Sequence, residues 1–298
     1  MRETFGVSTG LLLSGTLVAL VFAYTVRFLS VSIQAVESGL AKIKPSMDDA
    51  GRSLGLRPMG VLRRIHLPIM KGTVLTALLL AFLIKAGLFP LYAWLPASYH
   101  TLPAPILALF AGLLTKVGVY AMIRFFTLFF VQDPEFWHKL LFVVAGLTML
   151  SGGMAAISRY ETRKILSYHI ISQIGYMIMG LAIFTPLGVA GAIFFALHNM
   201  LAKTNTFVVS GLINRMRGSY SLKEVGGLFR ESPLLAVLFI IPAFALAGVP
   251  PLSVFFAKFI LIKAGFEDGH YWITAIAVLT GLLTLYSMIK IWNEAFLK

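Results

Sequence analysis

The sequence contains no cysteine, which excludes a disulfide framework and a thiolate metal site. It is also poor in charge, because charged residues make up 12% of the 298 positions while hydrophobic residues make up 58%. This balance excludes an ordinary soluble domain and is typical of an integral membrane protein. The P-loop, the dinucleotide fingerprint, the HExxH zinc motif and the serine elbow are all missing. The sequence therefore predicts no cofactor, no metal site and no enzymatic activity of its own.

The formal net charge of +13 raises the question of nucleic-acid binding. However, the basic residues are dispersed among short loops and apolar runs, and they form no basic patch interleaved with aromatic residues. The excess of lysine and arginine in cytoplasmic loops of membrane proteins explains most of them. We therefore expect the lipid bilayer as the partner of this chain and no nucleic acid.

Apolar runs of membrane-spanning length recur along the chain, since a span needs about 20 mostly apolar residues. They cover residues 11–29, 73–96, 103–130, 140–158, 165–184, 187–211, 233–264 and 272–292. The first run is long for a signal peptide and a basic flank follows it, which favours an uncleaved anchor. The pattern predicts an all-α, polytopic membrane helix bundle of about eight spans.

Two of these runs are expected to be broken helices. The run at 73–96 carries Lys85 near its centre, and Gly87 and Pro90 follow it directly. The run at 233–264 is long for one straight helix and contains Pro250–Pro251. Breaks at membrane depth are tolerated where they line protein or water, and they often mark an ion site.

The loop charges predict a topology. Basic loops place residues 159–164 and 212–232 inside together with the carboxyl-terminal tail, and 97–102 follows on the same side. Residues 30–72 are also inside, because they carry Lys42, Lys44, Arg52, Arg57, Arg63, Arg64 and Lys71. Only one run lies between the two inside segments. Either that run is re-entrant, or one half is inverted, or the halves have different origins.

All 12 acidic residues lie in loops or at the ends of the runs, whereas several cationic or titratable groups are embedded. The embedded groups are Lys85, Lys116, Lys203, Lys258, His169 and His198. Four midspan lysines cost about 10 kcal/mol on insertion scales. Lys263, Lys290 and Arg124 lie near run ends and can extend to the interface. Lys116, Lys203 and Lys258 have apolar turns on both sides, which favours a functional role.

Two consecutive runs carry polar stripes at helical spacing. His169, Ser172, Gln173 and Tyr176 share one face of the first run, and Asn199, Lys203 and Thr206 share one face of the next, with His198 beside them. Two such stripes in consecutive runs can face each other and hold water. For Ser172 and Thr206 the favoured interpretation is hydrogen bonding between helices. For Lys203 with His198 it is a proton path, because histidine titrates near neutrality.

From about residue 81 onward the chain resembles a known family. The matching segments are KAGLFPLYAWLP (85–96), GLLTKVGVYA (112–121), ILSYHIISQIGYM (165–177), LHNMLAKTNTF (197–207), LAGVPPLSVFFAKF (246–259) and MIKIWNEAF (288–296). They are similar to the D-like large subunit of Mrp-type cation/proton antiporters and, more distantly, to the proton-pumping membrane subunits of NADH:quinone oxidoreductase. Val254 stands where that family usually has glycine.

This resemblance implies a multi-pass subunit of a multisubunit antiporter complex in the cell inner (plasma) membrane. It implies that Lys85, Lys116, His198, Lys203 and Lys258 occupy proton-path positions. His169, Gln173, Tyr176 and Asn199 form a secondary polar stripe. The family's earlier helices are missing, including the one with an intramembrane glutamate that pairs with the lysine at position 85.

Residues 1 to about 80 resemble part of an iron(III)-type ABC transporter permease. The pattern EAA-x3-G-x9-I-x-L-P is matched by Asp49, Ala50, Gly51, Gly55, Ile65, Leu67 and Pro68, although Asp49 and Gly51 depart from its usual residues. The resemblance implies a short cytoplasmic helix within 46–57 and, through residues 47–68, docking of an ATPase. The chain then reads as a fusion of a permease-like fragment (1–80) with an antiporter-like domain (81–298).

Three functions follow from these observations. The first is a subunit of a Na⁺ or K⁺/proton antiporter that transfers protons along buried lysine and histidine residues. The second is a proton-pumping membrane subunit of an NADH:quinone oxidoreductase or hydrogenase-type complex. The third is an ABC permease fragment that recruits an ATPase.

Overall fold

The computed structural model describes residues 33–34, 37–129 and 134–298. In these ranges all the named secondary-structure elements are helices. The predicted span at 11–29 lies outside the described residues. The chain divides into two compact units, Met1–Ala81 and Phe82–Lys298.

The described part of the first unit is a short helical hairpin. It contains α3 (Pro45–Ser53), α4 (Pro58–Val61), a π-helical turn (Leu62–His66) and most of α5 (Leu67–Ala86). Pro45 is tolerated in the first turn of α3, and Asp48 lies near the positive end of that helix. The carboxylate of Asp48 accepts from His66 at 2.6 Å. The predicted short helix within 46–57 is therefore confirmed.

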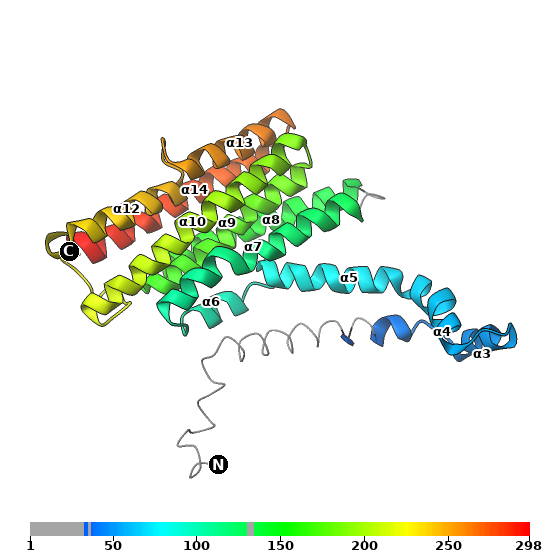
Figure 1. The fold of residues 1–298 in the computed structure, drawn as a ribbon. Coiled ribbons are helices and arrows are strands. Elements are labelled where there is room, and N and C mark those ends of the chain that lie inside the picture. The colour runs from blue at the N-terminus through cyan, green and yellow to red at the C-terminus, as the bar shows by residue number, and fades with distance from the viewer. Residues whose placement is uncertain (1–32, 35–36, 130–133) are drawn as a thin grey trace, which may run out of the picture. The chain divides into compact units, whose positions relative to one another are not determined.

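The second unit is a bundle of long helices that run side by side (Figure 1). After the end of α5 it comprises α6 (Trp94–Tyr99), α7 (Ala104–Leu128), α8 (Pro134–Ser158), α9 (Thr162–Ile183), α10 (Pro186–Arg217), α11 (Leu228–Glu231), α12 (Pro233–Ala247), α13 (Ser253–Glu267), α14 (Tyr271–Trp292) and a π-helical turn (Asn293–Leu297). In the described part of the chain, 6 helices are long and apolar enough to cross a membrane. The all-α, multi-pass architecture is confirmed.

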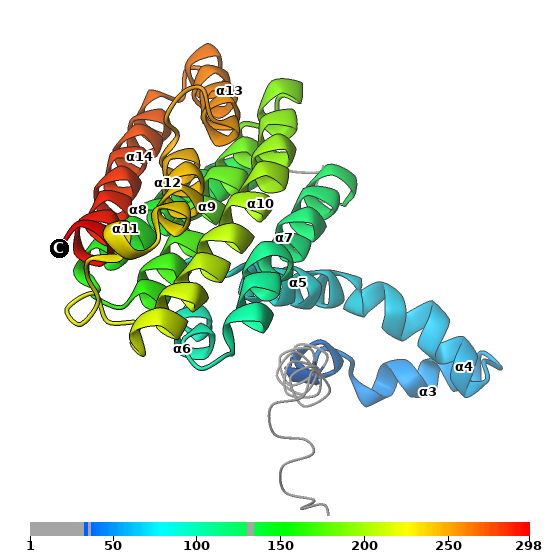
Figure 2. The same ribbon diagram turned by 60° about the vertical axis from the view of Figure 1, so that its left-hand side comes forward.

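Helix α9 is the centre of this bundle. Of the 18 residues in its most apolar segment, 94% are buried. Helices α8, α10, α13 and α14 pack around α9 (Figure 2). Glycines allow the closest approaches, since a Cβ at Gly152 of α8 would lie 2.5 Å from the backbone nitrogen of Ser172 on α9. Small residues at helix contacts are the usual means of bringing backbones together in membranes.

Both predicted helix breaks are present. α5 ends at Ala86, and Gly87 (φ 78°) begins the turn that leads through Pro90 to α6. The backbone groups freed by this turn are satisfied inside the protein. Phe89 N–H donates to Thr148 Oγ1 at 3.1 Å, and Trp94 Nε1–H donates to the Ile84 carbonyl at 2.8 Å. The second break separates α12 from α13 (Figure 1).

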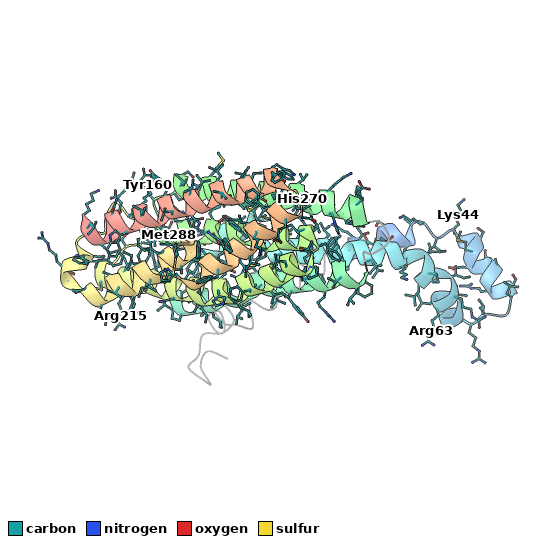
Figure 3. All side chains as sticks on the ribbon, turned by 90° about the horizontal axis from the view of Figure 1, so that it is seen from above. Lys44, Arg63, Tyr160, Arg215, His270 and Met288 are labelled. Atoms are coloured by element: carbon teal, nitrogen blue, oxygen red, sulfur yellow. The ribbon has the colours of Figure 1, made fainter. Side chains whose placement is uncertain are left out.

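The predicted inside loops lie at one end of the second unit. Glu161 and Ser221 form an isolated antiparallel bridge, and His100 lines a cavity together with both of their loops. At the tail, the carbonyl carbon of Lys298 lies 3.1 Å from the position a Cβ would take on Gly226. In Figure 3, Tyr160 and Arg215 lie toward this end and His270 toward the other. The shared side of these loops is confirmed, while the conflict with residues 30–72 stays a prediction.

Candidate functional site

The break between α12 and α13 brings a lysine onto the end of a helix. Lys258 of α13 is 5% exposed, and its ammonium donates to the carbonyls of Leu246 and Ala247 at 2.9 and 3.0 Å. These are carbonyls of the last turn of α12, which have no partner in their own helix. A cation is favourable there because the helix dipole is negative at its carboxyl end. The break and the buried charge therefore stabilise each other.

Gly248 fits this junction for two reasons. Its φ of 88° lies in the left-handed region, and a Cβ at this position would lie 2.9 Å from Cδ of Lys258. The lysine also lies over an aromatic ring, with Nζ 4.9 Å from the ring centroid of Tyr176 on α9. The hydroxyl of Tyr176 donates to the Ala277 carbonyl of α14. The ammonium is thus held between α12, α9 and α14.

The polar stripe of α9 pairs mainly with α14. His169 Nε2 lies 2.5 Å from Ser287 Oγ, and Gln173 Nε2 donates to Thr284 Oγ1 at 3.4 Å. The Ser287 hydroxyl also lies within hydrogen-bond distance of the Thr284 carbonyl, at 2.9 Å. His169, Gln173 and Tyr176 are all fully buried.

Lys203 of α10 contacts α9 near the amino-terminal end of that helix. It is fully buried, and its ammonium donates to the Leu166 carbonyl of α9 at 3.2 Å. Lys203 also lies within coulombic range of Lys116 and Lys258. Lys116 of α7 is 2% exposed and donates to the Ala111 carbonyl of its own helix at 2.7 Å. No carboxylate pairs with these three lysines in the described part of the chain.

Two of the predicted site residues lie apart from this buried line. Lys85 is half-buried in the last turn of α5, and no ion pair to it occurs within the described ranges. His198 is also half-buried, and its ring packs edge-on against Phe194 at 4.2 Å. The buried face of α10 is formed instead by Asn199, Lys203 and Thr206.

Several fully buried polar atoms have no hydrogen-bond partner among the described residues. Along the lysine line they are Thr115 Oγ1, His169 Nδ1, Gln173 Oε1, both amide atoms of Asn199, Ser210 Oγ and Thr280 Oγ1. Buried polar groups are nearly always satisfied, and internal water is their usual partner when protein groups are not. These atoms are therefore the groups in the interior of the bundle that internal water would satisfy.

One expectation about the stripes was wrong. Ser172 and Thr206 make no hydrogen bond between helices in the described structure; their hydroxyls donate to the carbonyls of His169 and Lys203 in their own helices. This local bonding is a common choice for serine and threonine in helices. The side chains on the α9 stripe hydrogen-bond to α14 rather than to α10.

The partner stripe on α14 was not predicted from the sequence. Thr280, Thr284 and Ser287 are fully buried and follow one another at spacings of four and three residues. That spacing places them on one helix face, so the signal was present in the sequence.

Lys290 of α14, like Lys258, donates to backbone carbonyls at the end of another helix. Its ammonium lies 2.9 Å from the Ile157 carbonyl and 2.7 Å from the Arg159 carbonyl, at the end of α8.

A multi-pass bundle with buried lysines at membrane depth is typical of membrane proteins that contain an ion pathway. A model of the family described as NADH:quinone oxidoreductase/Mrp antiporter, TM matches residues 56–284. The chain belongs to this family, which confirms the antiporter-like resemblance at that level.

Most of the individual relatives are named as antiporter subunits or belong to an Mrp complex. The D subunit of the Na(+)/H(+) antiporter of Alkalihalophilus pseudofirmus is 53% identical over 73% of this chain and 44% of that protein. A chain of the Mrp complex from Dietzia sp. DQ12-45-1b has a TM-score of 0.75 and 33% identity, covering 93% of this chain and 51% of that one. A chain of respiratory complex I from Thermus thermophilus has a TM-score of 0.71 and 25% identity, covering 92% and 59%. The chain spans about half the length of the relatives it matches.

The junction at Gly248 gives a first prediction. Gly248→Ala should lower the free energy of unfolding by about 1–3 kcal/mol more than Gly269→Ala, because its Cβ displaces Lys258. Gly269 is the matched control, since it has a φ of 75° and no atom within 4 Å of its Cβ position. The measurement is unfolding of the purified chain in detergent. Equal losses in the two variants would show that Lys258 is not packed on Gly248.

Proposed function

We propose that residues 81–298 form the carboxyl-terminal membrane half of a D-type subunit of a cation/proton antiporter. One observation carries this proposal. Lys203 and Lys258 are both buried and within coulombic range of His169 on the α9 polar stripe, and polar atoms of that stripe lack protein partners among the described residues. Ionisable residues at membrane depth mark proton and ion pathways.

The proposed mechanism is proton transfer along a hydrated line. Water bound by the unpartnered atoms of His169, Gln173 and Asn199 would connect the two lysines. Each ammonium is held by backbone carbonyls, which leave no buried anion behind when the lysine gives up its proton. We assign proton-path roles also to Lys85, Lys116 and His198, as the resemblance implies.

The relatives support a particular exchanged cation and an assembly with further subunits. Two proteins named as the D subunit of a Na(+)/H(+) antiporter support sodium as the exchanged cation. The Mrp complex of Dietzia sp. supports assembly with further subunits, and we propose the cell inner membrane as the location. The chain would act in transport and not as an enzyme.

The second candidate is a proton-pumping subunit of a quinone-reducing or hydrogenase-type complex. The similarity to a chain of Thermus thermophilus complex I supports it, at 25% identity. The 53% identity to an antiporter subunit favours the first candidate. Neighbouring genes for quinone-site subunits would reverse this preference.

A chimaera tests the buried line directly. Residues 82–298 would replace the matching part of the Alkalihalophilus pseudofirmus protein, and sodium-dependent proton flux would be measured in membrane vesicles. Lys203→Ala and Lys258→Ala should each lower the flux about tenfold or more, since loss of a proton-transfer group costs at least that much.

The control for this experiment is Lys263→Ala. Lys263 is on the same helix as Lys258, but it is exposed and pairs with Glu267 at 3.6 Å. It should leave the flux within about twofold, because an exposed ion pair contributes little. Unchanged flux in Lys258→Ala, at equal protein level, would contradict the proposed path.

The chain by itself should not exchange cations for protons. In the resembling family an acid on an earlier helix pairs with the lysine at position 85, and the described part of this chain offers Lys85 no carboxylate. Liposomes that hold the chain alone under a sodium or potassium gradient should therefore show no cation-dependent proton flux. A robust flux that disappears in Lys85→Ala would mean that the site is complete without that helix.

We propose separately that residues 1–80 are a permease-like fragment joined to the antiporter-like domain 81–298. The relatives reported above give this hypothesis no support, and it rests on the sequence pattern. The local structure adds one observation, since a Cβ on Gly51 would lie 2.8 Å from Cδ1 of Ile65, so two motif positions pack together. A nucleotide-binding subunit should co-purify with the chain by binding residues 47–68. If no such subunit co-purifies with a properly completed permease that carries the same loop, the docking role is rejected.

A further inference from the structure

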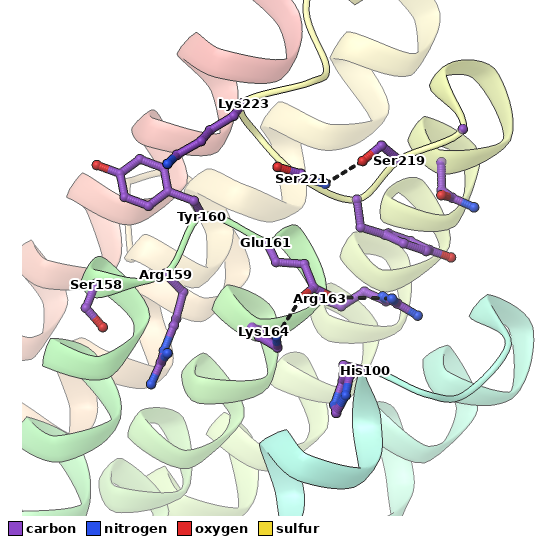
Figure 4. Close-up of a pocket in the computed structure, with 13 residues that line it drawn as sticks. His100, Ser158, Arg159, Tyr160, Glu161, Arg163, Lys164, Ser219, Ser221 and Lys223 are labelled. Atoms are coloured by element: carbon purple, nitrogen blue, oxygen red, sulfur yellow. Dashed lines mark hydrogen bonds and ion pairs between the residues drawn. The ribbon is translucent and has the colours of Figure 1, made fainter.

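A polar cavity of about 680 Å³ opens at the end of the bundle where the inside loops gather (Figure 4). Its walls come from the end of α6, the connection between α8 and α9, the last turns of α10 and the segment that follows α10. The buried lysine line contributes no residue to it. The cavity is therefore a second site, separate from the proposed proton path.

The two loops that form most of the cavity are fixed to each other. Thr162 donates to the Tyr220 carbonyl through both its N–H and its hydroxyl, each at 3.0 Å. In the other direction, Leu222 N–H donates to the Tyr160 carbonyl at 2.8 Å. These bonds form the bridge between Glu161 and Ser221. The cavity is thus part of the folded frame and not a gap between free loops.

The charge of the cavity is strongly positive. Arg159, Arg163, Lys164 and Lys223 line it, against the single carboxylate of Glu161. Glu161 pairs with Lys164 at 2.9 Å and with Arg163 at 3.3 Å. Arg159 and Lys223 pair with no carboxylate of the described residues, and the buried Nε of Arg163 has no hydrogen-bond partner among them. An anion is the missing partner for these groups.

Aromatic rings hold the cations in place. The guanidinium of Arg163 lies 3.6 Å from the ring centroid of Tyr220. The ring of Tyr160 has Lys223 Nζ at 5.2 Å and Lys290 Nζ at 3.5 Å. A stacked guanidinium keeps its N–H edge free for planar recognition of phosphate or carboxylate oxygens. The arrangement suits a phosphate group.

The position of the cavity favours one source of that phosphate. Of the candidate spans, α8 ends at Ser158 and α9 begins at Thr162, beside the cavity, which would place it near the level of the lipid headgroups. Tyrosines beside lysines and arginines are typical of that level. Basic pockets between spans on the cytoplasmic side recognise anionic headgroups, and each nearby cation adds to the attraction.

We propose that this cavity binds the phosphate of an anionic phospholipid headgroup, with Arg159, Arg163 and Lys223 as its principal partners. The occupant reaches the site from the bilayer and not from the aqueous phase. Bound lipid would tie the α8–α9 connection to the end of α10. The readout for this site is lipid binding, so it does not depend on ion transport.

The test uses the purified full chain in detergent with added phosphatidylglycerol or phosphatidylcholine. Bound lipid is counted by native mass spectrometry, and its affinity is taken from the rise in unfolding temperature. Phosphatidylglycerol should bind and stabilise, and the double variant Arg159→Gln/Lys223→Gln should weaken this binding about tenfold or more. Arg159→Lys/Lys223→Arg should retain it, which separates loss of charge from loss of folding.

The matched control is Arg215→Gln/Arg230→Gln. Both residues are exposed and belong to the predicted inside loop, but neither lines the cavity. This variant should bind phosphatidylglycerol like the unchanged chain. Three results would overturn the proposal: equal binding of phosphatidylcholine, equal loss in the control variant, or full occupation by inorganic phosphate without lipid, which would make the cavity a site for a free anion.

Discussion

The arrangement of the second unit depends on the need to satisfy polar groups inside an apolar bundle. Helix α9 is buried on all sides and yet carries His169, Gln173 and Tyr176. In the membrane each of these groups needs a partner within the protein, because lipid offers none. The hydroxyls and carbonyls of α14 supply most of them. This pairing fixes the register of α14 against α9, and the other helices pack around that pair.

In the same bundle, lysine side chains donate hydrogen bonds to the last backbone carbonyls of helices. Lys258 donates to the final carbonyls of α12, and Lys290 donates to those at the end of α8. In both places the lysine belongs to a different helix from the one it caps. The helix ends thus stabilise buried or half-buried cations without carboxylates. Within the described residues this explains how Lys258 stays embedded without a carboxylate partner.

The bundle separates two kinds of positive charge. The buried lysines are held by carbonyls in the interior, where proton exchange is the proposed role. The arginines and lysines around Glu161 lie at the loop end, stacked on tyrosines and partly unpaired. In the proposals above, the first group acts on protons that cross the membrane, whereas the second binds lipid headgroups. The same residue types would serve two functions because their burial and their partners differ.

The sequence by itself determined the multi-pass helical architecture of the described part, the two breaks, the burial of Lys116, Lys203 and Lys258 and the shared side of the loops. Those features follow from hydrophobic length, proline and glycine positions and loop charge, which are local properties of the chain. Only the tertiary structure decided that the α9 stripe pairs with α14, that Ser172 and Thr206 bond to their own helices, and that His198 lies apart from the buried face. Helical spacing shows which residues share a face, but it does not show which neighbour that face meets, because the rotation of each helix is set by packing.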